Sequence, residues 1–356
     1  MKTSPPLRLW TALACGLLLA TVSTGAATAA YADDDASSAS PTEVMDQLAP
    51  DQTTAASSDG AVAVTGSSPE DGGTQVTLTD ESAAADLKLT LQDSTRQAQS
   101  DDGYAVFTNE ASDLATWVKP APDGGQVIFY ATSDSATADL TVTLPQGIES
   151  QIEGEDGITI LHLADGESLA LYPAWARDAS GNALATEYHI DGDAITQVVQ
   201  TDASTQFPVV ADPAWSYTRN YSVATTTSAT AKKALHRCMN CYFPVTGAPK
   251  AWPTPGTLLP LTVGPWNFHC TFRNESSSSS QGVTSWGYTF DAAKGHVDGL
   301  GSHIGFTFSD QRDGSHDLDV YAYIKNDNPA GVGRPAYTAG ATFEWDTFAI
   351  NMRNAK

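Results

Sequence analysis

Residues 61–210 consist of short apolar runs separated by turn dipeptides. The spacing of these runs and turns constrains the fold more than any other feature of the chain. Leu140, Val142 and Leu144 alternate with threonines, the pattern of a strand with one buried face. The dipeptides each contain a glycine that can take the positive φ of a tight hairpin. They are Asp123-Gly124, Asp156-Gly157, Asp165-Gly166, Gly181-Asn182 and Asp191-Gly192. The spacing predicts an all-β module, either an antiparallel sandwich or a meandering sheet.

Charge divides the chain at the segment Phe207–Trp215. Residues 33–212 contain 32 acidic and four basic residues, whereas residues 213–356 contain 10 acidic and 12 basic residues. Pro208 and Pro213 favour extended backbone, so we expect the last strand of the acidic module to run into the second module. An acidic surface without clustered Lys and Arg argues against nucleic acid as a partner, and it helps to keep an exported protein soluble.

The first 32 residues have the pattern of a secretory signal peptide. Lys2 and Arg8 precede an apolar stretch, and Ala-x-Ala sequences end at Ala29 and Ala32. We therefore expect a secreted protein, and since no later apolar run reaches 18 residues we expect no membrane span. Residues 33–60 are rich in Ala, Ser, Asp and Thr, which predicts a disordered linker. An acidic β-rich module over 61–212 and a second module over 213–356 then follow.

The second module is predicted to be α+β, a small antiparallel sheet with flanking helices. Helices are expected over 228–237 and 339–353, where helix-forming or regularly spaced apolar residues occur. Residues 217–223 are expected to form an edge-like strand, and the polar run 274–281 a loop. The hairpin over 303–325 must place Phe308 opposite Leu318 and Phe306 opposite Val320, because a slip by one residue would bury acidic side chains. The same register pairs Thr307 with Asp319 and His303 with Tyr323, and leaves a three-residue loop that ends at Gly314.

The predicted mature chain carries Cys238, Cys241 and Cys270. An exported protein favours a disulfide. We expect Cys241–Cys270, since Cys270 alternates with aromatic residues on an inward face, and this leaves Cys238 free. The alternatives are a Cys₃His zinc site with His236 or His269, and a redox pair in Cys238-Met-Asn-Cys241. We expect no metal and no cofactor, and we interpret two acidic clusters as solvated turns rather than calcium ligands. These clusters are Glu153, Glu155 and Asp156, and Asp191 and Asp193.

The stretch Gly295–His303 has the most catalytic character. His296 and Asp298 are two residues apart, which places them on one side of an extended backbone, and Ser302 follows nearby. A histidine that is oriented by a carboxylate beside a hydroxyl is what nucleophilic hydrolysis requires. The competing interpretation is that the glycines shape a turn and that His296 braces it.

Several stretches resemble known sequences of one bacterial group. Residues 191–199 followed by 207–213 (FPVVADP) resemble the end of an acidic leader module of secreted actinobacterial proteins. Residues 241–249, 264–268 and 294–302 resemble an uncharacterised secreted family of the same bacteria. The resemblance implies export and a two-module layout, and it brings no activity with it.

Three functional hypotheses follow from these observations. The first is an exported extracellular binding or interaction protein, in which Trp215, Trp252, Tyr321 and Tyr323 form a contact surface for a protein or glycan. The second is a secreted hydrolase that uses His296 and Asp298. The third, compatible with either, is a proprotein whose acidic half inhibits the second half until it is cleaved near residues 211–215.

Overall fold

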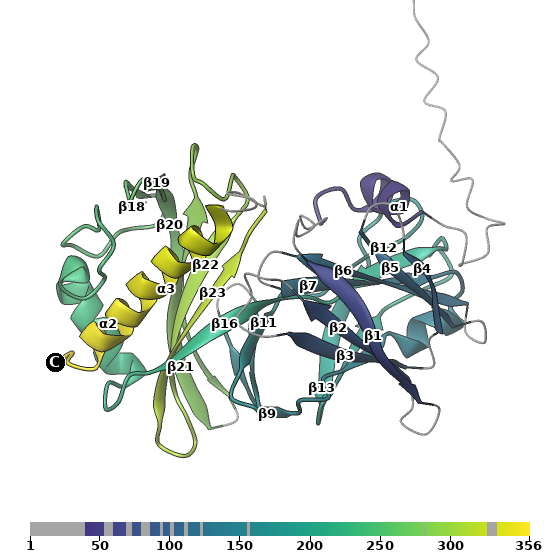
Figure 1. The fold of residues 1–356 in the computed structure, drawn as a ribbon, viewed down its shortest axis with the longest axis horizontal. Coiled ribbons are helices and arrows are strands. Elements are labelled where there is room, and N and C mark those ends of the chain that lie inside the picture. The colour runs from purple at the N-terminus through teal and green to yellow at the C-terminus, as the bar shows by residue number, and fades with distance from the viewer. Residues whose placement is uncertain are drawn as a thin grey trace, which may run out of the picture.

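The structure is a computed structural model that describes residues 40–52, 60–68, 73–79, 86–92, 95–99, 103–109, 113–121, 124–154, 157–280, 282–325 and 333–356. Within these ranges the chain is mostly antiparallel β-sheet and ends in a helix, α3 (Gly333–Met352). Figure 1 shows two lobes, formed by the N-terminal and C-terminal halves of the chain and joined through strand β16 (Ala214–Ser222). None of the helices in the described ranges is long and apolar enough to cross a membrane.

The N-terminal lobe is a sandwich of two sheets. One sheet has the strand order β1 (Ala61–Ser68), β2 (Gly73–Thr79), β3 (Leu87–Gln92), β8 (Thr141–Thr143), β14 (Ala194–Val199), β13 (Thr186–Asp191). The other includes β4 (Thr95–Gln99), β5 (Ala105–Asn109), β6 (Leu114–Ala121), β7 (Gly124–Ala131), β12 (Trp175–Arg177) and β15 (Val209–Asp212). Val76 and Val142 from the first sheet share one apolar core with Phe107 and Phe129 from the second. Of the two arrangements expected from the sequence, this packing corresponds to the sandwich.

A short helix covers the outer face of the second sheet. Helix α1 (Pro41–Leu48) begins at Ser40, whose hydroxyl accepts a hydrogen bond from the amide of Glu43. Its buried residues pack on Trp117 and Tyr130. The expected disordered linker over 33–60 is therefore wrong for residues 40–52, and residues 33–39 and 53–59 lie outside the described ranges. The few apolar residues of this stretch, Val44, Met45 and Leu48, share one helical face. Because they are spaced in this way, they are enough to bury one side of the helix.

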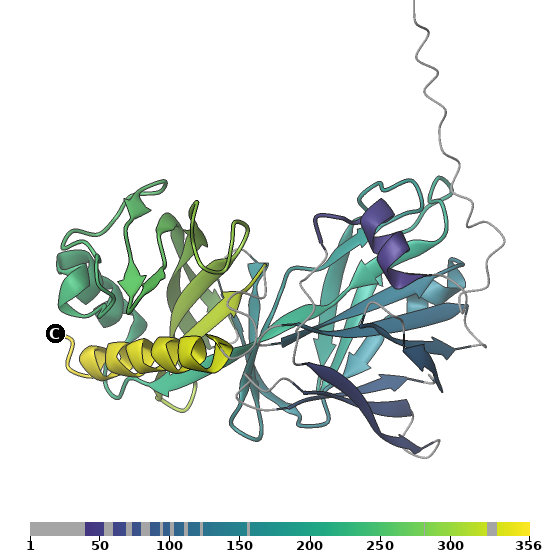
Figure 2. The same ribbon diagram turned by 45° about the horizontal axis from the view of Figure 1, so that its top comes forward.

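The C-terminal lobe is built on a sheet with the strand order β17 (Leu258–Leu259), β20 (Cys270–Ser280), β21 (Val283–Ala292), β22 (His303–Asp310), β23 (His316–Tyr323), β16. Helices α2 (Ser228–Arg237) and α3 pack on one face, where Leu235 and Phe348 join the core around Phe306. Figure 2 shows α3 running along the side of this lobe. On the opposite face, Tyr321 packs with Ile160 of the strands β9 (Ile148–Glu153), β10 (Thr159–Leu163) and β11 (Ser168–Leu171). The sheet is thus a middle layer between helices and strands.

Strand β16 belongs to both lobes. Its residues 214–216 pair with β7, residues 215–218 pair with β11, and residues 218–222 pair with β23. The strand that the sequence suggested to be edge-like is therefore an inner strand. The expected module boundary after Asp212 falls between two paired strands, and residues 211–215 are buried. A protease could reach this segment only after the sheet had opened.

The register of the hairpin β22–β23 is confirmed. Phe308 lies opposite Leu318, Phe306 opposite Val320, Thr307 opposite Asp319, and His303 opposite Tyr323. The amide of Gln311 donates to the carbonyl of Ser315 over 2.9 Å, which closes a three-residue loop with Gly314 at a φ of 86°. The helix over 228–237 is confirmed as α2.

The polar run after Asn274 is a strand and not the expected loop. Residues 274–280 complete β20 and pair with residues 283–289 of β21. Most of the serines in this stretch are exposed. Backbone hydrogen bonds to β21, and not the burial of side chains, therefore hold the strand in place. A pattern that is read only from apolar residues misses such a strand.

Candidate functional site

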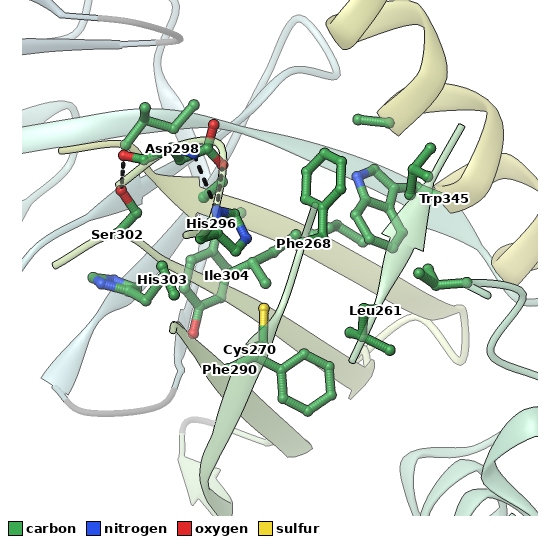
Figure 3. Close-up of a pocket in the computed structure, with 18 of the residues that line it drawn as sticks. Leu261, Phe268, Cys270, Phe290, His296, Asp298, Ser302, His303, Ile304 and Trp345 are labelled. Carbon is green, nitrogen blue, oxygen red and sulfur yellow. Dashed lines mark hydrogen bonds and ion pairs between the residues drawn. The ribbon is translucent and has the colours of Figure 1, made fainter. Parts of the chain in front are cut away.

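An apolar pocket of about 120 Å³ lies in the C-terminal lobe between the sheet and α3 (Figure 3). Most of its lining side chains are aromatic or aliphatic, and they come from strands, from the loops before β20 and from α3. The principal ones are Phe243, Leu261, Phe268, Cys270, Phe290, Ile304, Val320 and Trp345. The loop at one end of this pocket is recognisable in the sequence, but the pocket is not, because its walls come from segments far apart in the chain.

Small residues create the space. On the helix-facing side of the sheet, Cys270 lies opposite Ala292, and Ile304 lies opposite Ala322. The position that follows Ile304 on this face of β22 is Phe306, whose ring stacks on that of Tyr288, its partner on β21, and these rings fill the layer. Large side chains on the same face therefore close the core below the pocket, whereas alanine and cysteine leave it open.

His296 lies at the polar end of the pocket. Its Nδ1 accepts a hydrogen bond from the amide of Asp298 over 3.1 Å, and its ring meets the ring of Phe268 edge-on at 5.2 Å. Burial, together with the nearby His269, lowers the pKa of His296 to about 4. The imidazole is therefore neutral near pH 7, and its proton resides on Nε2 because Nδ1 acts as an acceptor. Figure 3 shows the ring extending from its loop toward Phe268 and Ile304, so His296 offers a neutral N–H donor at this end of the pocket.

The three residues of the predicted catalytic group lie close together but do not form a proton relay. The hydroxyl of Ser302 donates to the carbonyl oxygen of Asp298 and accepts from the amide of Lys325, both over 2.8 Å. The carboxylate of Asp298 is 3.7 Å from Nδ1 of His296, which already accepts from an amide. Since the hydroxyl proton of Ser302 points to a carbonyl and not to the imidazole, this arrangement braces the loop Gly295–Ser302.

Two of the four residues of the proposed aromatic contact surface are buried, and the other two are half-buried. Trp215 is 3% exposed and packs in the core of the N-terminal lobe, and Tyr321 is 1% exposed between the two lobes. Trp252 is half-buried and stacks on His236, with ring centroids 4.5 Å apart, and Tyr323 stacks on His303. The interpretation of these four residues as a surface was wrong for Trp215 and Tyr321, because β16 and β23 are inner strands whose two faces are both covered.

The disulfide joins Cys238 to Cys241, and Cys270 is a free, buried thiol. The expected bridge between Cys241 and Cys270 is therefore wrong. Cys238 ends α2, and the single 3₁₀ turn that follows (Met239–Cys241) brings the two α-carbons to 5.3 Å, a usual disulfide spacing. Cys270 does face inward as expected, but it lies in the pocket wall.

We expect the Cys270 thiol to resist alkylation in the folded protein at pH 8. Burial, together with the carboxylates of Asp298 and Asp291, raises its pKa to about 12, so only about one molecule in ten thousand is a thiolate at this pH. Treatment with iodoacetamide followed by non-reducing peptide mapping should find Cys270 modified only after unfolding. Rapid modification of the native protein, or a bridge that includes Cys270, would contradict the structure.

In the part of the chain that the structure describes, no three His, Cys, Asp or Glu side chains are grouped to hold a metal ion. The carboxylate of Glu153 accepts a hydrogen bond from Ser278 over 2.8 Å, and Asp191 and Asp193 lie on an exposed turn. Glu155 and Asp156 lie outside the described residues.

Comparisons with known proteins identify no family. No family model matches the sequence, and no curated protein matches it. Among solved structures, the chain is similar to the di-domain ARO/CYC StfQ from the steffimycin biosynthetic pathway, with 7% identity and a TM-score of 0.22 over 75% of this chain and 87% of that one. A similarity of this size carries no information about fold or activity.

Proposed function

We propose that this chain is an exported extracellular binding protein whose C-terminal lobe holds a small, mainly apolar molecule. The observation that carries the proposal is the pocket of about 120 Å³ between the sheet and α3. Export is supported by the signal-like N-terminus and by the Cys238–Cys241 disulfide, a bond typical of oxidising compartments. The sheet with α2 and α3 would act as the α+β binding module, and the acidic lobe would hold the far side of its sheet.

The pocket sets the size and polarity of its ligand. A dry apolar cavity of about 150 Å³ is enough for benzene, so this pocket suits one aromatic ring or an alkyl group of similar size. The Nε2–H of His296 would donate to a carbonyl, ether or hydroxyl oxygen on the ligand. A neutral ligand is favoured, because most of the lining is aromatic or aliphatic and a charge buried there is poorly solvated.

Hydrolysis at the loop Gly295–Ser302 is the alternative function, and it has less support. The Ser302 hydroxyl is engaged with two backbone groups, and the low pKa of His296 makes its imidazole a weak base. This geometry favours a binding role for the loop.

Filling the pocket should abolish binding. We expect fluorinated benzenes, followed by ¹⁹F NMR, to bind the wild-type protein with a dissociation constant on the order of 100 µM, or about 5.5 kcal/mol. 4-Fluoroacetophenone should bind about fivefold more tightly than 4-fluorotoluene, because only its carbonyl accepts a hydrogen bond from His296. Ala341→Trp, at a half-buried position on the pocket side of α3, should weaken binding at least tenfold.

The matched control is Ile350→Trp on the same helix, at a side chain that is 55% exposed. This variant should bind as the wild-type protein does, and both variants should keep its far-ultraviolet circular dichroism. If the wild-type protein binds none of these compounds, or if Ala341→Trp binds them equally well, the pocket is not the binding site.

A further inference from the structure

A second cavity, of about 310 Å³, lies where the two lobes meet. It is on the side of the C-terminal sheet that faces away from α3, bordered by β9 and β10 and by the loop between β22 and β23. Its lining is polar, in contrast to the first pocket. It includes Glu149, Ser150, Gln151, His162, Arg312 and Asp317.

Ser150 and His162, which line this cavity, form a continuous hydrogen-bonded line with Asp319, which is buried behind them. The hydroxyl of Ser150 on β9 lies 3.2 Å from Nδ1 of His162, which is its cross-strand partner on β10. Nε2 of His162 lies 3.2 and 3.3 Å from the two carboxylate oxygens of Asp319 on β23. Asn220 on β16 donates to the same carboxylate over 2.9 Å. The line therefore joins residues from both lobes and ends on a fully buried acid.

The hydrogen-bond partners fix the direction of proton transfer. A carboxylate only accepts, so Asp319 holds the proton of the neutral imidazole on Nε2, and Nδ1 is left to accept from Ser150. A hydroxyl beside a base that is itself oriented by a carboxylate is the arrangement that activates a nucleophilic serine. The trio proposed from the sequence, His296, Asp298 and Ser302, lacks this direction.

We propose that Ser150, His162 and Asp319 form a nucleophilic site for small carboxylic esters, with Ser150 and His162 as catalytic residues and Asp319 as a positioning residue. The oxygen of Ser150 bonds to the acyl carbon while its proton passes to Nδ1 of His162. The bond to the alcohol oxygen then breaks, and the alcohol leaves with that proton. Water next attacks the acyl-serine with His162 as base, which releases the carboxylic acid and restores the hydroxyl.

The charges around the cavity select the substrate. Glu149, Asp313 and Asp317 line it on the acidic side, and Arg312 lines it as a cation. An anionic ester would meet net negative charge, so a neutral or cationic ester is favoured.

The groups around His162 also set its pH dependence. Burial lowers its pKa, but the hydrogen bond and charge of Asp319 on β23, with Asp317 on the same strand and Glu149 on β9, raise the pKa above its ordinary value overall. Because only the neutral imidazole can accept the proton of Ser150, reaction at this site should increase as the pH rises through a midpoint above 6.5.

The test is labelling of the full chain with a neutral alkyl fluorophosphonate, which an activated serine attacks with loss of fluoride. Peptide mass spectrometry should find the adduct on Ser150, formed at a rate that follows this pH profile. His162→Gln should slow the labelling about 100-fold or more. Asp319→Asn should move the midpoint of the pH profile downward, because the carboxylate that raises the pKa of His162 is gone. Ser204→Ala, which removes an exposed serine bonded to Asp202 but not to a histidine, should leave the rate unchanged.

Two results would overturn the proposal. One is an adduct on Ser150 that forms no faster than one on Ser204, and the other is a rate that His162→Gln leaves undiminished. Should Asp319→Asn fail to fold, the pH profile of the wild-type protein and the His162→Gln variant decide the question. Binding of fluorinated benzenes to the other pocket reports on the first proposal separately.

Discussion

Replacing Trp215 with alanine is expected to lower the free energy of unfolding by about 3–5 kcal/mol, the usual effect of removing a buried tryptophan. Trp215 is 3% exposed and packs in the core of the N-terminal lobe, and its backbone is part of β16, whose later residues pair with β23. We therefore expect the two lobes to unfold in a single, earlier transition. Urea denaturation followed by near- and far-ultraviolet circular dichroism measures both effects.

Phe343→Ala is the control for this substitution. Phe343 is aromatic, but it is 68% exposed on α3, so its loss should change stability by no more than about 0.5 kcal/mol. If the Trp215→Ala protein shows two transitions, with only the first displaced, the lobes are energetically independent and the shared strand does not couple them.

Gly305→Ala should cost about 3 kcal/mol although it adds a single methyl group. A Cβ atom at this position would lie 2.1 Å from Cζ of Tyr321, its cross-strand partner. The tyrosine ring is buried against Ile160 between the lobes and cannot move aside without separating them. Overpacking of this kind usually costs about 1–3 kcal/mol, and we expect the upper end because the neighbouring layer is a sheet. Thermal and urea unfolding measure the loss.

Two further variants show whether the methyl group acts through this contact. Tyr321→Ala should remove the clash, so the double variant Gly305→Ala/Tyr321→Ala should be more stable than the sum of the two single effects predicts. Gly340→Ala on α3, where the new Cβ would have only ordinary contacts beyond 3.6 Å, should raise stability by about 0.5–1 kcal/mol. Additive effects in the double variant would contradict the proposed clash.

Local pattern predicted local structure well in this chain. The alternation of Phe306 and Phe308 with polar residues fixed the register of β22 against β23, and helix-forming residues located α2. The prediction was wrong for two segments whose structure depends on strand pairing or on a few tertiary contacts. The serines of β20 are held by β21, and the short helix α1 is held by the outer face of β6 and β7.

The candidate sites could not be predicted from the sequence because they, too, depend on tertiary contacts. His296, Asp298 and Ser302 are neighbours in the sequence, so their proximity was predictable, but their hydrogen-bond directions depend on backbone groups such as the amide of Lys325. Ser150 and Asp319 are 169 positions apart by their numbers and meet only because β16 aligns the two lobes. The Cys238–Cys241 bond likewise depended on a single 3₁₀ turn after α2.

The position of β16 in the chain also affects the order in which the strands can pair during synthesis. The ribosome completes β7 and β11 before β16, so until residue 218 has emerged these two strands present unpaired edges to solvent. Exposed edges are where nascent chains associate wrongly. Once β16 docks, its remaining edge is the template on which β23, made about a hundred residues later, must align. We therefore expect the acidic half to form first and to act as an intramolecular scaffold for the half that contains the apolar pocket.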